Sequence, residues 1–599
     1  MASVVQEQIK GGKTMKYTIG ISLGYNASAC IMDENQNVIY AASEERFTNT
    51  KNTKQFPLLA IKNGLETTGI NPSDIVYCRY SHYQNADIYD MYRHSYGIDG
   101  KLPERTYPKL SSPISTINQI EFEETFIKAH LYMLGVNVKQ IKRIHHHYAH
   151  AACSYILTPF HDKDATNLYV VMDGFGDGMS VSAWRENDNV LELLGNMPMC
   201  KSIALVYQFV TGALGYKEHQ HEGKLTGLAA YGDDKKYYLE FSNLYDSFEN
   251  IVSDPECDSP IVDFDIFTEM KKRTYALVNS FTKGMSDAEK FEESKHIAAA
   301  LQTFAENKAL EYIYGIIFNC GFTNVNIMLS GGLFANVKIN QKVHELVPEV
   351  KNVFVAPPMG DEGTCIGAAA GYVLQERPDA TMTNMTMRMG TSHTVDEVLD
   401  VMDDELGYEL IEDAQSVAEA IGRDLSENKI VCLFDGKMEF GPRALIGRSI
   451  MYNCRDVGAN DWLNKQLGRT EFMPFAPFCK EEHMRDLFHE TEGKEFALKN
   501  MTVTVNCKDE FIQNYPAACH VDNTARPQVI SQDENEVAWM ILDEYEKITG
   551  EKALINTSFN LHNYPIIESP KVAVESWKQS NTHCLYIGCG QKWYRIIRK

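Results

Sequence analysis

Two segments of the chain that lie 152 residues apart share one order of strands and turns. Residues 17–23 read as an apolar strand, which a turn at 24–26, a strand at 28–32, a turn at 33–37 and a strand at 38–42 follow. Strands at 169–172, 180–184 and 190–194 repeat this order, with a glycine-rich turn at 173–178. The segments align without a gap, so that Gly24 corresponds to Gly176 and Ser28 to Ser180. The repeat favours an internal duplication over a chance similarity between two hairpins.

A duplicated three-stranded unit, each copy followed by helices, is typical of the actin-like ATPase (ribonuclease H-like) fold. In that fold, glycine-rich turns from the two halves face one another across a cleft and approach phosphate oxygens through backbone N–H groups. A long helix is predicted over about 286–320, and buried strands at 325–329 and 353–356. A polar stretch at 380–384 is the predicted linker between a first α/β domain, 16–383, and a second α/β domain, 384–599.

Charge and hydropathy exclude several classes of partner. The 57 Lys and Arg residues against 81 Asp and Glu give a formal net charge of −24, which disfavours nucleic-acid binding. No apolar run approaches the ~20 residues that cross a bilayer, and residues 1–16 do not resemble a secretory signal. The 14 cysteines contain no CxxC pair, so we expect reduced, mostly buried thiols and a cytoplasmic protein.

A cluster of four histidines between residues 145 and 150 predicts a metal site. The residues that follow it favour a helix, and on a helix His146 and His150 share one face with Cβ atoms about 5–6 Å apart. That spacing presents two imidazoles to one metal ion. Asp173 ends a predicted strand and Asp361 follows one, where an α/β cleft gathers its ligands. Two histidines and two aspartates would suit Fe(II), Mn(II) or Zn(II).

Several strings occur together in one order along nearly the whole chain, from about residue 16 to 599. They are HHYAHAA (146–152), DGFGD (173–177), KLTGLAAYG (224–232), SGGLFAN (330–336), MGDEG (359–363), MEFGPRAL (438–445), RTEFMPFAP (469–477) and NTSFN (556–560). In these strings the chain resembles the O-carbamoyltransferases that include the cephem, tobramycin and nodulation-factor enzymes.

The resemblance implies a fold and a two-step reaction. The first domain is similar to the actin-like domain of threonylcarbamoyl-adenosine tRNA-modification proteins, and the second to the threonylcarbamoyl-adenylate synthase (YrdC-like) fold. The second domain would make carbamoyl-adenylate from carbamoyl phosphate and ATP with Mg²⁺. The carbamoyl group would then pass to a hydroxyl of a small-molecule natural product at the metal site, for which Fe(II) is the favoured ion. Residues 84–110 would help to shape the acceptor site, and a homodimer is implied by resemblance.

The resemblance also assigns residues. His146, His150, Asp173 and Asp361 match the metal ligands, and Gly331, Gly332 and Asn336 match the segment that holds the adenosine. Lys224 and Gly227 fall in a string expected near the phosphates. Arginine forks bond phosphate oxygens in pairs, so Arg443, Arg448, Arg469 and Arg526, with Lys465, are candidates for holding the two anionic substrates. Ser558 and Asn560 are candidate donors to phosphate or carbamoyl oxygens.

The chain departs from the family at the first turn, where many members carry His-Asp and this chain carries Tyr25-Asn26. The histidine is the expected base for the acceptor hydroxyl, and neither a neutral amide nor a phenol replaces it well at pH 7. A metal-bound hydroxide, His147 or Asp177 would then serve. Asn26, His147, Asp177 and Arg443 are therefore the candidate catalytic residues.

Two other enzyme classes and a regulator compete with this interpretation. A threonylcarbamoyl-adenosine-type tRNA-modifying enzyme would share both folds, but the net charge of −24 argues against it. An actin-like small-molecule kinase would explain the duplication, but not the histidine pair or the last third of the chain. A non-catalytic metal- or nucleotide-binding regulator is the third alternative.

Overall fold

The computed structural model describes most of the chain. The described residues are 15–82, 113–162, 164–188, 190–252, 263–376, 386–402, 406–466, 474–580 and 582–598. Four sequence predictions fall outside them: the role of Arg469, the linker at 380–384, the domain boundary between 383 and 384, and the acceptor-shaping segment 84–110.

The first half of the N-terminal region is a five-stranded sheet. Strands β1 (Tyr17–Leu23), β2 (Ser28–Asp33) and β3 (Val38–Ser43) form an antiparallel meander, as the sequence predicts. Strands β4 (Ile75–His82) and β5 (Gln140–Arg143) extend it in parallel, which gives the order β3-β2-β1-β4-β5. Helices α2 (Glu45–Thr48), α3 (Leu58–Thr68) and α5 (Pro113–Met133) belong to this half.

The second half repeats this topology. Strands β6 (Thr166–Gly176), β7 (Met179–Asn187) and β8 (Val190–Pro198) form the meander, and β9 (Val325–Ser330) and β10 (Val350–Val355) add to β6 in parallel. The order β10-β9-β6-β7-β8 matches that of the first sheet. The duplication predicted from the sequence is therefore present in the strand order.

One correction concerns the second glycine-rich segment. The sequence predicts a turn over 173–178, but β6 continues through Asp173 to Gly176, with a shift of register after Met172. The reversal itself needs only Asp177 and Gly178, both with positive φ. Pairing with β7 at Gly176 thus overrides local turn chemistry.

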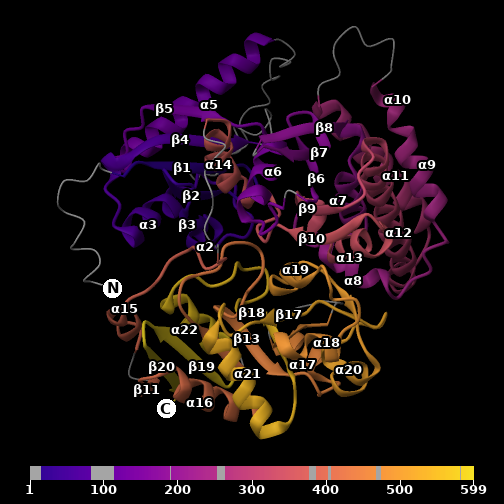
Figure 1. Ribbon diagram of the computed structural model, residues 1–599. Coiled ribbons are helices and arrows are strands. Elements are labelled where there is room, and N and C mark those ends of the chain that lie inside the picture. Colours follow the sequence, from indigo (N-terminus) through magenta and orange to yellow (C-terminus); the bar gives the residue numbers. More distant parts are fainter. Residues whose placement is uncertain are drawn as a thin grey trace.

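The last helix of each half crosses to the sheet of the other half. Helix α6 (His146–Leu157) follows β5 but packs on β6 and β9, whereas α14 (Thr364–Glu376) follows β10 but packs on β1, β2 and β4. Figure 1 shows both helices between the two sheets. Their backbones touch, because a Cβ at Gly367 would lie 1.7 Å from the Ala149 carbonyl oxygen.

Helices between β8 and β9 enclose the second sheet. They are α7 (Ile203–Ala213), α8 (Glu222–Ala229), α9 (Tyr238–Ser247), α10 (Glu249–Val252), α11 (Asp263–Phe281) and α12 (Asp287–Cys320), and α13 (Val337–Leu346) follows β9. Helix α12 confirms the predicted long helix. It begins with a capping box at Ser286 and Glu289 and ends at Gly321, which has φ +68°.

The C-terminal region is a mixed eight-stranded sheet with helices on both faces. Its strands are β11 (Leu406–Ile411), β20 (Lys592–Arg598), β19 (Cys584–Cys589), β12 (Val431–Phe434), β13 (Arg448–Asn453), β18 (Ala553–Ser558), β14 (Ala476–Lys480) and β17 (Gln528–Ile530), in that order. Helices α16 (Ala414–Ser426) and α21 (Glu536–Thr549) pack with Val431 and Leu433 on one face, and α22 (Pro570–Gln579) with Cys432 and Phe434 on the other.

The remaining elements of the C-terminal region are short. They are α15 (Val395–Leu399), α17 (Ala459–Gln466), α18 (Met484–Leu487), α19 (Glu495–Lys499), α20 (Asp509–Asn514) and the ribbon β15 (Val505–Asn506) with β16 (Thr524–Ala525).

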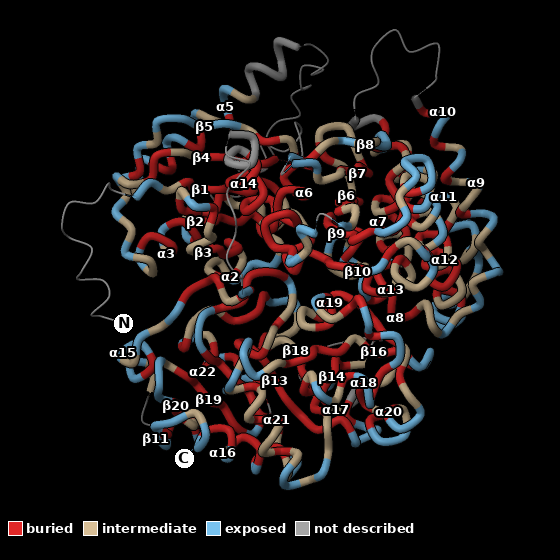
Figure 2. The backbone as a smooth tube through the Cα atoms, in the orientation of Figure 1, coloured by how far each residue is buried: buried red, intermediate tan, exposed pale blue. Residues whose placement is uncertain are grey.

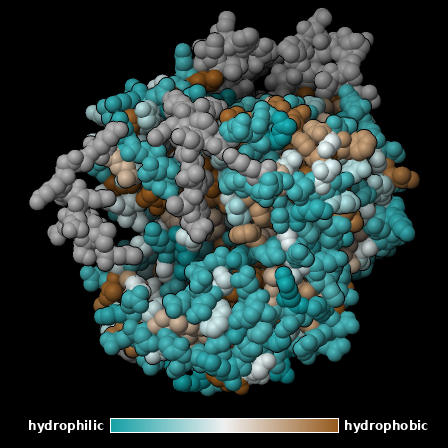
Figure 3. All heavy atoms as spheres, viewed as in Figure 1, coloured by the Kyte–Doolittle hydropathy of each residue, from teal (hydrophilic) through white to brown (hydrophobic). Residues whose placement is uncertain are grey.

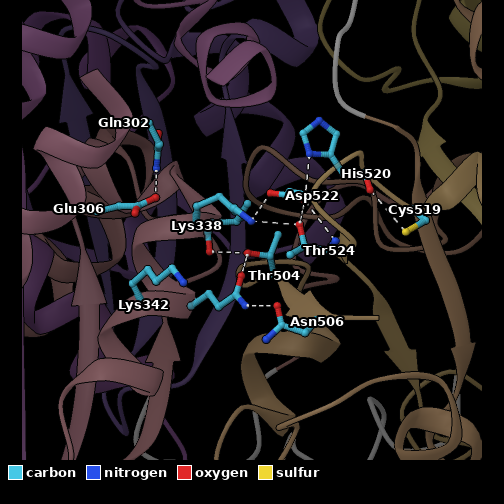
Figure 4. Close-up of polar contacts among 12 residues, drawn as sticks. Gln302, Glu306, Lys338, Lys342, Thr504, Asn506, Cys519, His520, Asp522 and Thr524 are labelled. Carbon is cyan, nitrogen blue, oxygen red and sulfur yellow. Dashed lines mark hydrogen bonds and ion pairs between the residues drawn. The ribbon is translucent and has the colours of Figure 1, made fainter. Parts of the chain in front are cut away.

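Helix α13 joins the two regions through a polar network (Figure 4). Lys338 donates to Asp522 at 2.5 Å and to Thr524 at 3.1 Å, and Thr504 donates to Gln341 at 2.7 Å. Asn340 donates to the Thr502 carbonyl oxygen at 2.7 Å. Helix α13 therefore belongs to the first region by sequence but packs on the ribbon of the second.

The core of both regions is apolar, and the described surface in Figure 3 is largely hydrophilic. Figure 2 shows buried backbone running along the strands of all three large sheets. Among the described residues, no helix combines the length and apolar character that a membrane span requires. The described cysteines form no disulfide and are mostly buried, which confirms the expectation of free thiols.

Candidate active site

The structure brings His146, His150, Asp173 and Asp361 together, with one ligand atom of each within 4.8 Å of the others. His146 Nε2 lies 3.2 Å from His150 Nε2, 3.3 Å from Asp173 Oδ2 and 3.4 Å from Asp361 Oδ1. His150 Nε2 lies 3.5 Å from Asp361 Oδ1. For metal–ligand bonds of about 2.0–2.2 Å, neighbouring ligand atoms lie about 3.0–3.5 Å apart. The two imidazoles and two carboxylates therefore fit one divalent metal ion, and we call them the quartet.

Backbone contacts fix the imidazole of His146. As the first residue of α6, it donates its N–H to Asp177 Oδ2 at 2.8 Å, and Arg143 holds the other oxygen of Asp177 at 2.7 Å. The ring lies against the backbone of β6, since a Cβ at Gly176 would lie 2.2 Å from its Cδ2 atom. A glycine at the end of β6 thus makes room for the quartet residue His146.

The carboxylates of the quartet come from the second half. Asp173 Oδ1 accepts a hydrogen bond from the Gly332 N–H at 2.8 Å, which leaves Oδ2 facing His146. Asp361 follows β10, and its carbonyl oxygen accepts from Thr364 Oγ1 at 2.8 Å. The segment that follows β9 therefore orients the carboxylate of Asp173, and Thr364 holds the backbone of Asp361.

The quartet is charged even without a cation. Burial disfavours imidazolium, but the carboxylates of Asp361 and Asp173 outweigh it and raise the pKa of His146 to about 10. Burial opposes ionisation of Asp361 as well, yet His146 and His150 hold its pKa well below the usual range. Two carboxylates in a buried site demand positive charge, which a divalent cation would supply.

One cavity of about 480 Å³ links the quartet to the C-terminal region. From the first half it is lined by Tyr25, Asn26, Glu45, Arg46, Lys51 and Asn52. From the second half Asp173, His219, Glu222, Gly332, Asn336, Asp361 and Glu362 line it, and from the C-terminal region Arg443, Ser558, Asn560 and Tyr564. All three sheets therefore contribute to one site.

Arg443 reaches this cavity from the C-terminal region. Its turn is held by Arg46, which donates to the Gly441 carbonyl oxygen at 2.8 Å, and Gly441 has φ +121°. Arg443 Nη2 lies 3.4 Å from the Ala335 carbonyl oxygen, and its buried Nε has no hydrogen-bond partner within the described part of the chain. Burial lowers the pKa of Arg443 to about 10. A cation so placed would be stabilised by an anion in the cavity.

Asn336, Ser558 and Asn560 line the cavity but already have partners. Asn336 caps α13 with its side-chain oxygen and donates to Gln302 at 2.8 Å. Ser558 donates to Asn560, whose amide donates to the carbonyl oxygens of Leu561 and Tyr564. These residues therefore shape the wall of the cavity.

His147 and Asp177 do not line the cavity. His147 is fully buried, with Nε2 donating to the Met179 carbonyl oxygen at 3.0 Å and Nδ1 at 2.9 Å from Ser182 Oγ. Burial lowers its pKa well below the ordinary value. Asp177 is used by Arg143 and by the first turn of α6. The structure gives both residues a role in placing α6, and neither is among the residues that line the cavity.

Several predicted nucleotide-site residues also lie outside the cavity lining. Arg448 is fully buried and donates to the carbonyl oxygens of Asp435, Gly436 and Gly447, with its guanidinium over Phe434. It therefore braces a turn. Gly331 (φ +98°) lies against Met172, and Lys224 and Gly227 are buried within α8. Lys465 is exposed on α17, and Arg526 follows β16. Neither residue is among those that line the cavity.

Sequence reasoning missed several ionisable residues that line the cavity, and His219 and Glu362 are two of them. Asn26 donates to Glu362 Oε2 at 3.2 Å, and burial raises the pKa of Glu362 to about 7. His219 stacks on Tyr25 with ring centroids 4.1 Å apart. Glu362 directly follows Asp361 in the sequence, which could have indicated that it lies at the site. Nothing in the local sequence places His219 beside Tyr25, almost 200 residues earlier.

Comparison with known proteins identifies the family. Residues 17–370 match the family described as "Carbamoyltransferase N-terminus" and residues 422–591 match "Carbamoyltransferase C-terminus". An uncharacterized protein of Methanocaldococcus jannaschii is 29% identical over 95% of this chain and 98% of its own length. Nodulation protein NolNO of Sinorhizobium fredii is 26% identical over 94% of this chain and 78% of its own.

Among solved structures, the activator of 2-hydroxyisocaproyl-CoA dehydratase from Clostridium difficile covers 62% of this chain and 100% of its own, with 10% identity and a TM-score of 0.31. The two family matches span both the quartet and Arg443 and confirm the resemblance seen in the sequence. The chain belongs to the carbamoyltransferase family.

Proposed function

We propose that the protein is an ATP-dependent O-carbamoyltransferase. The C-terminal region, as a YrdC-like domain, makes carbamoyl-adenylate from carbamoyl phosphate and ATP and releases phosphate and pyrophosphate. The N-terminal region, as an actin-like (ribonuclease H-like) domain, transfers the carbamoyl group to a hydroxyl of a small-molecule natural product.

The observation that carries this proposal is the shared cavity. Asp173 and Asp361 of the quartet line the same space as Arg443 of the C-terminal region. An intermediate made beside Arg443 would reach the quartet without leaving this cavity. A labile mixed anhydride benefits from such a route because water would otherwise hydrolyse it.

Arg443 is suited to the adenylation step. Two anionic substrates repel one another, and a guanidinium fork can bond oxygens of both. Its buried Nε and the Gly441-Pro442 turn that directs it supply the orientation. Gly332 and Asn336, which precede α13, line the cavity beside Arg443, where the N–H groups of a helix start favour negative charge.

The quartet is suited to the transfer step. His146, His150, Asp173 and Asp361 would hold the metal, with Fe(II) our first choice and Mn(II) or Zn(II) as alternatives. A bound divalent cation polarises a carbonyl oxygen and so favours attack on its carbon. The residues themselves keep the site compact, because Gly332 and the first turn of α6 fix two of the four side chains.

Separating the two steps tests the proposal. The purified protein, loaded with Fe(II), is incubated with ATP, carbamoyl phosphate and a panel of hydroxyl compounds that begins with monosaccharides and glycerol. Pyrophosphate release reports the first step, and mass spectrometry of the carbamoylated product reports the second. We expect carbamoyl-phosphate-dependent conversion of ATP to AMP and pyrophosphate.

Two variants should divide the activity. His146→Ala should abolish transfer and largely retain pyrophosphate release, whereas Arg443→Ala should abolish pyrophosphate release. Arg455→Ala, which removes an exposed arginine of the same region paired with Glu551, is the matched control and should change neither. Formation of ADP would indicate a kinase instead, and equal loss of both steps in His146→Ala would refute two separate sites.

A further inference from the structure

The first turn of the duplicated fold lacks the histidine expected of the family, yet an imidazole stands beside it. The ring of His219, from the loop between α7 and α8, stacks on the ring of Tyr25 at a centroid distance of 4.1 Å and an interplanar angle of 23°. Both residues line the cavity that contains Asp173 and Asp361. An imidazole from a distant loop therefore lies beside Tyr25, where the sequence itself has no histidine.

The loop is built to hold this imidazole in place. His219 has φ +63°, a left-handed conformation that residues other than glycine adopt uncommonly, although asparagine, aspartate and histidine do so more often than the rest. Its N–H donates to Glu222 Oε1 at 2.6 Å, and its carbonyl oxygen accepts from Asn52 Nδ2 at 2.6 Å. Strain of this kind persists where the surroundings determine the conformation, and it gathers at functional sites.

The imidazole itself is available for chemistry. Among the described residues, no hydrogen bond involves either ring nitrogen of His219, and the side chain is exposed to the cavity. The competing carboxylates are engaged, since Glu222 accepts from the His219 N–H and Glu362 accepts from Asn26. His219 differs from both in that its acceptor nitrogen is open to a ligand.

The charges around His219 favour its neutral, proton-accepting form. Desolvation in the cleft is the largest cause of the lowered pKa, and the Lys54 ammonium acts in the same direction. The carboxylates of Glu218, Asp361 and Asp173 oppose them without reversing the shift. Lys54 also lies 3.9 Å from the centroid of the Tyr25 ring, so that it flanks the same stack.

We propose that His219 is the general base that accepts the proton of the acceptor hydroxyl during carbamoyl transfer. The acceptor oxygen forms a bond to the carbamoyl carbon, and the bond from that carbon to the phosphate oxygen of the adenylate breaks. AMP leaves with that electron pair, while the hydroxyl proton moves to the free ring nitrogen of His219. The imidazolium then returns the proton to water in the cavity. This assignment rests on the proposed function.

His219→Asn tests the assignment, because asparagine tolerates the left-handed conformation and cannot accept the proton. The variant and the unchanged protein are loaded with Fe(II), and the compound that accepts carbamoyl in the panel serves as probe, or glycerol where none is preferred. We expect transfer to fall by about 10²–10⁴-fold, as for loss of a general base, with pyrophosphate release and iron content unchanged. Added imidazole should restore part of the transfer, and the acidic limb of the pH–rate profile should disappear. His161→Asn, at an exposed histidine beside Glu186, is the matched control.

Three outcomes would overturn the assignment. They are transfer within about threefold of the unchanged protein, loss of pyrophosphate release together with transfer, or no recovery with imidazole. If Glu222→Gln or Glu362→Gln instead shows the selective loss of transfer, that carboxylate is the base. Failure of the proposed function would look different, because the unchanged protein would then release no carbamoyl-phosphate-dependent pyrophosphate.

Discussion

The two halves of the N-terminal region share one topology but not one role. At the offset of 152 residues, Asp173 of the quartet corresponds to Ile21, which is fully buried in the first sheet. The first half supplies His146 and His150 from its last helix, and the second half supplies both aspartates. Divergence of a duplicated scaffold has thus placed imidazoles on one copy and carboxylates on the other.

The crossing of α6 and α14 explains how ligands from separate copies meet. Each helix leaves its own sheet and packs on the other, so that α6 lies against the segment before α14. A simple side-by-side duplication without this exchange would leave His146 and Asp361 at the ends of different sheets.

The largest effect on transfer and metal affinity should follow from removing Asp173, whose counterpart in the first half is Ile21. Asp173→Ala should lower transfer and metal affinity by at least about 100-fold, since groups that merely support a metal ligand are already worth about 10–100-fold. Metal content by plasma mass spectrometry and the transfer assay measure it. Ile21→Ala is the matched change in the other copy and should lower stability but keep the metal; loss of metal from both variants would contradict the asymmetry.

Disturbing the crossing should destabilise both halves together. A Cβ at Gly367 would lie 1.7 Å from the Ala149 carbonyl oxygen, so Gly367→Ala should cost at least about 3 kcal/mol in the free energy of unfolding. Urea titration followed by circular dichroism measures this. Gly315→Ala, at a helical glycine of α12 with open space around it, is the control and should stabilise slightly or change nothing. Equal stability of both variants would show that the helix contact is dispensable.

A smaller effect on metal affinity should come from Gly176, which ends β6 just before the turn of the second half. Gly176→Ala should push the His146 ring out of place and weaken metal binding by about 10–100-fold, because a Cβ would lie 2.2 Å from the ring. Gly178→Ala, in the same turn with nothing near its Cβ, should strain the backbone but keep the metal affinity. Competition with a chelator measures both, and identical affinities would refute the steric role of Gly176.

The smallest effect should lie in the first copy, away from the quartet. Ile21→Val should cost about 0.5–1.5 kcal/mol of stability, as for the loss of one buried methylene group. Transfer and metal content should remain within twofold of the unchanged protein, because Ile21 only packs in the sheet. A clear fall in transfer would mean that the first sheet tunes the site directly.

The sequence predicts much of the scaffold because its signals are local. Buried strands with short turns identified the duplication, and the spacing of His146 and His150 placed two ligands on one helix face. The same helical geometry could have excluded His147, since adjacent residues of a helix point about 100° apart. The extension of β6 through Asp173 was missed because sheet pairing, which is not local, overrode the glycine-rich composition.

Whether a candidate site residue lines the cavity could not be predicted for the same reason. From the sequence alone, an arginine that would bind phosphate cannot be told from one that, like Arg448, donates to nearby carbonyl oxygens of its own chain. His219 could not be found because its position depends on how the loop before α8 packs against Tyr25. Both are properties of tertiary contacts between segments far apart in the chain.

Helix α13 carries a consequence for how ligands enter. Its first turn holds Asn336 in the cavity wall, and its body is bonded to Thr502, Thr504 and Asp522 of the C-terminal region. The two regions therefore cannot swing apart as rigid leaves without breaking this seam. We therefore expect ligands to reach the cavity while this seam stays closed, which would keep Arg443 and the quartet at a constant separation.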